Sequence, residues 1–155
     1  MRKIGVVIFG LLVASHLGAA GSGALSLKLA VLDPNVKSGA RIMIEVTTTN
    51  QSDQTVTYHD TSRVCDYPIT VLAGNGVAAS KTAYKKQSTC GAGQFATNNK
   101  NILVTLKPGE SKNERIEITE LYDVSQPGEY SVSVQRTFSG IGHFSSNSVS
   151  IVVTP

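Results

Sequence analysis

The sequence contains no tryptophan, only two cysteines and few charged residues, and these shortages exclude several classes of protein. Charged residues make up 16% of the 155 residues, whereas about a quarter is usual, so a charge-rich disordered chain is excluded. The mean hydropathy of +0.01 excludes a protein with many membrane spans. A formal net charge of +3 is too small to predict a nucleic-acid-binding surface.

Long hydrophobic runs are also scarce, and the one at the N-terminus is short. Two basic residues precede Ile4–Ala14, which has no charge, and residues 18–20 are Gly-Ala-Ala, the small residues of a cleavage site. A membrane-spanning helix needs about 20 apolar residues, so this pattern predicts a signal peptide over residues 1–20. The expected mature chain, residues 21–155, is secreted or periplasmic. We expect no stable membrane anchor after cleavage, because no cysteine near the cleavage site could carry an attached lipid.

The motifs of common catalytic and metal sites are missing. There is no Gly-x-Ser-x-Gly nucleophile motif, and no glycine-rich loop precedes a helix to hold phosphate. A blue-copper site needs two histidines, a free cysteine and usually a methionine, but His59 and His143 lie in opposite halves of the chain. A Ser-His-Asp arrangement using His59 with Asp60 or Asp66 stays open. We predict no catalytic residue, no cofactor, no bound metal and no enzymatic activity.

Cys65 and Cys90 are the only thiols, and they stand 25 positions apart. In an exported protein an isolated pair of this kind predicts a disulfide. The alternatives are a redox pair, for which Cys-x-x-Cys is usual, and a zinc site, which needs further ligands nearby.

Apolar and polar residues alternate along most of the mature chain, as in half-buried antiparallel strands. The alternation is clearest in 25–31, 41–47, 115–118, 130–135 and 148–153. Proline, glycine and asparagine lie between these segments, and Gly74-Asn75-Gly76 is expected to join strands over Pro68–Ala73 and Val77–Tyr84 in a hairpin. At most one helical turn is expected, within Ile118–Val124. The fold class predicted is an all-β, immunoglobulin-like antiparallel β-sandwich of 7–9 strands with one disulfide.

A structural corner is predicted where Pro127 and Gly128 turn the chain and Tyr130 opens the next strand. The Tyr130 hydroxyl is expected to bond to backbone across this corner, as in a tyrosine corner. Three motifs that follow Asn50 carry a resemblance to a known family. They are Leu106-x-Pro108-Gly109-Glu110-Ser111, Leu121-Tyr122-Asp123 and Pro127-Gly128-x-Tyr130.

These motifs resemble secreted bacterial immunoglobulin-like domains, and they are similar to the non-catalytic N-terminal domain of deuterolysin-type zinc peptidases. More loosely, the chain resembles small proteinase-inhibitor-like sandwiches. The resemblance implies a fold, because the shared motifs consist of residues that form turns and corners. It implies no protease activity, because the zinc-binding His-Glu-x-x-His motif of the peptidases is absent.

Two surface features are candidates for contact with a partner. Tyr84, Lys85 and Lys86, with Lys81, form a basic patch that either meets a partner or protects an edge strand from pairing. The second is the segment 139–144, expected to be a loop between the last two strands. It carries Ile141, His143 and Phe144, and Phe144 either contacts a partner or covers the core.

We therefore expect an exported binding or structural module that contacts another exported or envelope protein through end loops or an edge strand. The alternative is a proteinase-inhibitor-like sandwich that uses the loop 85–101, tethered by Cys90, to occupy a protease cleft. Neither reading predicts contact with nucleic acid, and the sequence does not define the oligomeric state.

Overall fold

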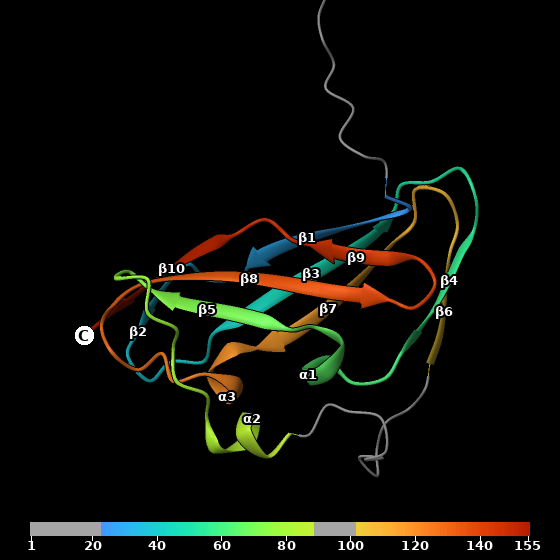
Figure 1. Ribbon diagram of the computed structural model, residues 1–155. Coiled ribbons are helices and arrows are strands. Elements are labelled where there is room, and N and C mark those ends of the chain that lie inside the picture. Colours follow the sequence, from blue (N-terminus) through green and yellow to red (C-terminus); the bar gives the residue numbers. More distant parts are fainter. Residues whose placement is uncertain (1–22, 89–101) are drawn as a thin grey trace, which may run out of the picture.

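The computed structural model describes residues 23–88 and 102–155, which form sheets stacked face to face (Figure 1). The first sheet has the order β1-β3-β7 and consists of β1 (Leu25–Val31), β3 (Met43–Asn50) and β7 (Ser111–Glu117). The second sheet has the order β2-β10-β8-β5. Its strands are β2 (Asn35–Lys37), β10 (Val149–Thr154), β8 (Gly128–Phe138) and β5 (Ile69–Ala73). A further strand, β9 (Gly142–Ser145), pairs with β8. A third sheet pairs β4 (Val56–Asp60) with β6 (Ile102–Leu106).

The strand order is that of an immunoglobulin-like sandwich, in which one sheet contains strands A, B and E and the other G, F and C. The prediction of an all-β sandwich is therefore confirmed. The described residues contain ten strands, however, rather than seven to nine. The additional short strands include β2 and β9, which have three and four residues and are too short to show a clear alternation. In addition, β2 pairs with β10 in parallel, whereas the other strand pairs are antiparallel.

The alternating residues that predicted the strands fill the space between the sheets. The buried apolar side chains from β1, β3, β8 and β10 are Leu25, Leu27, Leu29, Ile44, Val46, Tyr130, Val132, Val134, Phe138, Ile151 and Val153. Because successive residues of a strand point to opposite faces, one apolar stripe per strand is enough to build this core. The opposite stripe is polar and faces solvent.

In the described part of the chain, three short helices interrupt the strands: α1 (Arg63–Asp66), α2 (Ala83–Gln87) and α3 (Ile118–Leu121). The single helical turn expected within Ile118–Val124 is α3, which buries Ile118 and Leu121. The strand expected over Val77–Tyr84 is wrong, because after the turn at residues 74–76 only isolated bridges form, such as Leu72 with Ala78. Alanine and serine at 78–80 bury little apolar surface, and Thr82 then caps α2.

The expected corner is present at the start of β8. Pro127 precedes Gly128, the first residue of the strand, and the Tyr130 hydroxyl donates a hydrogen bond to the Gln126 carbonyl at 2.9 Å. The ring of Tyr130 is buried in the core and its hydroxyl is bonded to the backbone. Packing of the ring and this hydrogen bond together stabilise the corner.

The segment 139–144 differs from the expected loop, because residues 142–145 form β9 and pair with β8. Phe144 packs edge to face against Phe138, with ring centroids 5.7 Å apart, and Ile141 also packs against the core. Phe144 therefore lies over the core, and its contact with a partner stays a prediction. Apolar burial favours this position over exposure to solvent.

The predicted Cys65–Cys90 bridge stays a prediction. Cys65 lies in α1, whereas Cys90 lies outside the described residues.

Candidate functional site

The helices α2 and α3 pack together at one end of the sandwich, at the lower edge of Figure 1. The Thr82 side chain joins them, because its Oγ1 accepts a hydrogen bond from the Lys85 amide at 3.2 Å and donates one to the Glu120 carbonyl at 2.6 Å. The backbone adds a bond from the Thr82 amide to the Leu121 carbonyl at 3.0 Å. A helix of five residues is not stable by itself, so these contacts hold α2 in place, with Tyr84 and Lys86 exposed.

Tyr84 projects from α2 into a groove of about 450 Å³, called here the Tyr84 groove. Its residues come from α1, α2, α3 and the neighbouring strands, and they include Arg41, Met43, Arg63, Arg115 and Glu120. Tyr84 is 55% exposed and does not belong to the hydrophobic core. An exposed aromatic ring beside several guanidinium groups is typical of residues that contact another molecule.

Each arginine of the Tyr84 groove is held by a carboxylate. The pairs are Arg41 with Glu117, Arg63 with Glu114 at 3.1 Å, and Arg115 with Glu45 at 3.0 Å. The hydrogen bond from Arg41 holds the pKa of the Glu117 carboxyl below its usual range. The arginine side chains remain 65–78% exposed, so the guanidinium groups are oriented by their partners and still open to solvent.

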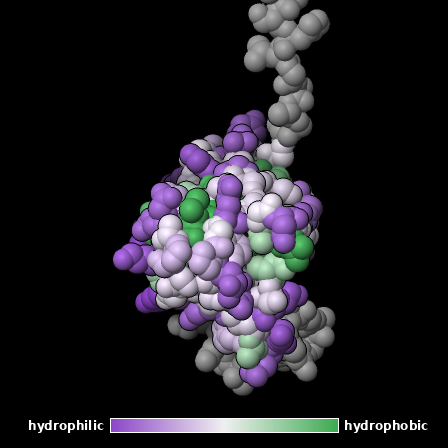
Figure 2. All heavy atoms as spheres, turned by 90° about the vertical axis from the view of Figure 1, so that its left-hand side faces the viewer, coloured by the Kyte–Doolittle hydropathy of each residue, from purple (hydrophilic) through white to green (hydrophobic). Residues whose placement is uncertain are grey.

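A second groove, of about 530 Å³, is called here the lysine groove. Its positive charges are Lys37, Lys81 and Lys86, and Asp123 is the one carboxylate lining it among the described residues. Figure 2 shows hydrophilic residues at the lower end of the molecule, where α2 lies. Both grooves are lined by residues of α2 and α3, so the helix pair connects them. The two grooves and the helix pair form one candidate binding surface.

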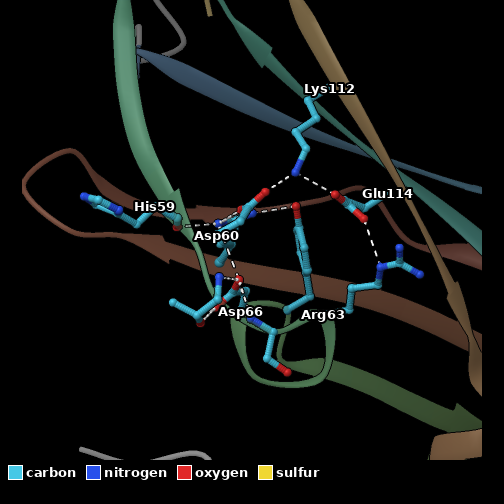
Figure 3. Close-up of polar contacts among 10 residues, drawn as sticks. His59, Asp60, Arg63, Asp66, Lys112 and Glu114 are labelled. Carbon is cyan, nitrogen blue, oxygen red and sulfur yellow. Dashed lines mark hydrogen bonds and ion pairs between the residues drawn. The ribbon is translucent and has the colours of Figure 1, made fainter. Parts of the chain in front are cut away.

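A buried ionic cluster lies next to this surface and joins the three sheets (Figure 3). Asp60 of β4 accepts hydrogen bonds from Lys112 of β7 and from Arg136 of β8. Lys112 also pairs with Glu114 at 2.6 Å. Burial raises the pKa of the Asp60 carboxyl, but the hydrogen bonds from Lys112 and Arg136 outweigh burial and lower it overall. The cluster therefore holds the β4–β6 pair to both main sheets.

Arg136 is only 2% exposed, and its guanidinium is surrounded by aromatic rings. Its central carbon lies 4.3 Å from the ring centroid of Phe138, 4.6 Å from that of Tyr67 and 5.0 Å from that of Tyr58. Such contacts stabilise a cation whose hydration shell has been removed. Burial, followed by the Asp60 charge, raises the pKa of the Tyr58 hydroxyl to about 12, so this ring stays neutral.

The cluster also fixes the wall of the Tyr84 groove. Asp66 of α1 lies 3.9 Å from Arg136 and accepts hydrogen bonds from the backbone amides of Thr61 at 2.7 Å and Ser62 at 3.0 Å. These bonds close the turn that leads into α1 and thereby place Arg63 at the groove. A small pocket of about 180 Å³ lies between the cluster and this turn.

The structure separates the predicted contact residues into two groups. Tyr84 lines the Tyr84 groove and Lys86 the lysine groove, whereas Lys85 turns inward and donates to the Val64 carbonyl at 2.9 Å. Ile141, His143 and Phe144 lie at the β8–β9 turn, on another part of the fold (Figure 1). His143 is exposed, and its Nδ1 shares a hydrogen bond of 2.9 Å with Thr137 Oγ1. The roles of these residues in binding stay predictions.

The predicted inhibitory loop is described only at its start. Lys85, Lys86 and Gln87 belong to α2, and residues 89–101 lie outside the described part of the chain. The sequence also allowed the lysines to protect an edge strand from pairing. This role does not apply to Lys85 and Lys86, because they lie in the helix α2 rather than in a strand.

Sequence reasoning missed the arginines of the Tyr84 groove and the Asp60–Arg136 cluster. A signal for the cluster was present, since Arg136 continues the inward series Tyr130, Val132 and Val134 at the same spacing of two. No such signal exists for Arg41, Arg63 and Arg115, which meet only through tertiary packing.

Within 23–88 and 102–155, no group of three or more His, Cys, Asp or Glu side chains could hold a metal ion. The same part of the chain has no helix that is both long and apolar enough to cross a membrane.

No family model matches the chain, and no curated protein matches it. Solved structures do resemble it. One is the CARDB domain of a Pyrococcus furiosus protein in complex with di-metal ions, at 14% identity and a TM-score of 0.42, with 84% of this chain and 93% of that chain covered. Another is BslA, a bacterial hydrophobin, at 13% identity and a TM-score of 0.39, with 86% and 97% covered.

A β-glucosidase from Listeria innocua in complex with glucose is similar at 18% identity and a TM-score of 0.43. The match covers 86% of this chain but 16% of the β-glucosidase. At these identities and TM-scores the likenesses carry no argument about function. None of the three supports the resemblance to deuterolysin-type peptidases, which stays a prediction.

Proposed function

We propose that this protein is an exported, non-enzymatic binding domain that contacts another protein through the surface around α2. The exposed Tyr84 beside three oriented guanidinium groups is the observation that carries this proposal. Tyrosine, arginine and methionine are enriched where protein interfaces concentrate their binding energy. The carboxylate partners of the arginines restrict these side chains before binding, which lowers the entropy lost when a partner docks.

Export is part of the proposal and depends on the signal-peptide pattern in residues 1–20, which lie outside the described residues. The mature chain recovered from outside the cytoplasm is expected to begin at Gly21. Mass spectrometry of that material checks this, and a chain that keeps Ile4–Ala14 would contradict it.

Replacing Tyr84 by alanine is expected to weaken binding of the partner about 30-fold, which corresponds to about 2 kcal/mol. The partner is first identified by placing a photo-crosslinking residue at position 84 of the full chain in its own host. Isothermal titration calorimetry with the purified partner then compares the wild-type protein and the Tyr84→Ala variant. The thermal midpoint of the variant should be unchanged, because Tyr84 lies outside the core.

Position 77 provides the matched control. Val77 is 61% exposed and lines neither groove, so a crosslinker there should give no specific product and Val77→Ala should bind normally. The proposal fails if position 84 crosslinks no better than position 77, or if Tyr84→Ala binds the partner as tightly as the wild type.

A further inference from the structure

The lysine groove contains positive charge that the described residues do not neutralise. Lys37 ends β2, Lys81 precedes α2 and Lys86 lies within α2, so two separate parts of the chain bring three lysines to one groove. Within residues 23–88 and 102–155, none of the three forms a salt bridge. Like charges gathered in this way favour an anionic ligand.

The one carboxylate of the lysine groove is already engaged. Asp123 Oδ1 accepts hydrogen bonds from the Ser125 amide at 3.1 Å and the Ser125 hydroxyl at 2.7 Å. These bonds lower the pKa of the Asp123 carboxyl, so it remains ionised but is directed at its own turn. The groove therefore keeps a surplus of positive charge.

Lys85 does not line the lysine groove, but it is a fourth unpaired positive charge near Lys81 among the described residues. Burial, together with the charge of Lys81, lowers the pKa of the Lys85 ammonium. Its Nζ donates to the Val64 carbonyl, which is a neutral acceptor and does not cancel the charge.

The floor of the lysine groove is apolar. Ile42, Tyr122 and Val124 line it and are at most 6% exposed, and Ala40 packs beside them. The turn that carries Lys37 depends on Gly39, which has φ of +81°, and closes with a bond of 3.0 Å from the Ala40 amide to the Lys37 carbonyl. A glycine with positive φ at this position is typical of a type II turn. The groove thus combines a cationic rim with an apolar floor.

We infer that the lysine groove binds an acidic peptide segment whose carboxylates contact Lys37, Lys81 and Lys86 and whose apolar side chains lie on the Ile42–Val124 floor. This inference rests on the proposed function, since the segment belongs to the protein partner that contacts Tyr84. Lysine is a flexible point charge, and it pairs with the mobile carboxylates of Asp and Glu without a fixed geometry. An apolar floor suits peptide side chains better than a heavily hydrated acidic polysaccharide.

Fluorescence anisotropy of the mature chain with a labelled eight-residue peptide, alternating Glu with Leu, tests the inference. A peptide with Gln in place of Glu is the ligand control. The double variant Lys81→Gln/Lys86→Gln should bind the acidic peptide about tenfold more weakly, from the loss of two surface ion pairs. Lys28→Gln/Lys107→Gln has the same net charge, and neither residue lines the groove, so it should bind as the wild type does.

Binding should also weaken between 20 and 500 mM salt, because exposed charges are screened. The inference is overturned if both double variants bind alike, if the Gln peptide binds as well as the Glu peptide, or if a polyuronate binds while the peptide does not. The peptide is measured without the partner, so its failure leaves the crosslinking result at position 84 untouched. A missing crosslink at position 84 together with tight peptide binding would instead overturn the proposed function.

Discussion

Replacing Asp60 by alanine is expected to lower the free energy of unfolding by about 3–5 kcal/mol, the usual loss when one partner of a buried ion pair is removed. Arg136, which is 2% exposed in the wild-type structure, would have no carboxylate in hydrogen-bond contact in this variant. The remaining acceptors are the Tyr67 hydroxyl and the His59 carbonyl, which do not cancel its charge. The loss should also break the link between β4 and Lys112 of β7, whereas the His59 carbonyl still joins β4 to Arg136 of β8.

Chemical denaturation in guanidinium chloride measures this effect, with Glu45→Gln as the control. Glu45 pairs with Arg115, whose side chain is 65% exposed, and the loss of such a pair changes stability by less than about 1 kcal/mol. The variant Asp60→Ala/Arg136→Met should recover part of the loss, because it removes the uncompensated charge and keeps an apolar stem among the rings. The cluster has no structural role if Asp60→Ala and Glu45→Gln unfold at the same denaturant concentration.

The same cluster makes stability depend on pH at both extremes. The pKa of Asp60 is below its ordinary value of 3.8 in the folded protein, so its contribution is present above about pH 4 and is lost as the pH falls through the folded pKa. The pKa of Lys112 is raised from 10.5 to about 12 by its carboxylate partners against the effect of burial. Its contribution is complete below pH 10.5 and is lost as the pH rises through about 12. Asp60→Asn should flatten the acid limb of this profile.

Replacing Asn50 by alanine is expected to destabilise the protein by about 3 kcal/mol, because buried backbone groups lose their partners. Asn50 is fully buried at the end of β3. Its Nδ2 donates to the Gln54 carbonyl at 2.7 Å and the Leu106 carbonyl at 2.9 Å, and its Oδ1 accepts from the Ser52 amide at 3.0 Å. One side chain therefore ties the β3–β4 turn to the end of β6.

Thermal unfolding of Asn50→Ala and Ser52→Ala separates this role from a simple turn effect. Ser52→Ala removes one hydroxyl that bonds to Asn50 Oδ1 at 2.8 Å, and a loss of about 1 kcal/mol is expected. Equal losses in the two variants would mean that the bond to the Leu106 carbonyl contributes little.

The strands could be predicted from the sequence because one apolar stripe per strand leaves a period of two, and β1, β8 and β10 lie where that period is clearest. The helix α2 could not be predicted in this way. It buries no side chain and depends on the contact between Thr82 and Glu120, which are 38 residues apart. Strand β9 was missed because its four residues were read as a glycine-rich loop.

The candidate site was predicted only in part. Tyr84 and Lys86 lie in the grooves because α2 is short and exposed, and the polar sequence around them indicated a surface position. Lys85 lies in the same polar sequence, but its side chain points inward. Successive residues of a helix are rotated by about 100° about its axis, so Lys85 faces a different direction from Tyr84 and Lys86. The arginines come from the segment before β3, from α1 and from β7, and only the folded chain brings them together.

The burial of Asn50 has a consequence for production of the protein in eukaryotic cells. Asn50-Gln51-Ser52 has the spacing of an N-glycosylation acceptor. A glycan would replace one hydrogen of the Nδ2 group, whereas that nitrogen donates to two carbonyls in the interior. Sugar attachment at Asn50 and the closed sandwich therefore exclude each other.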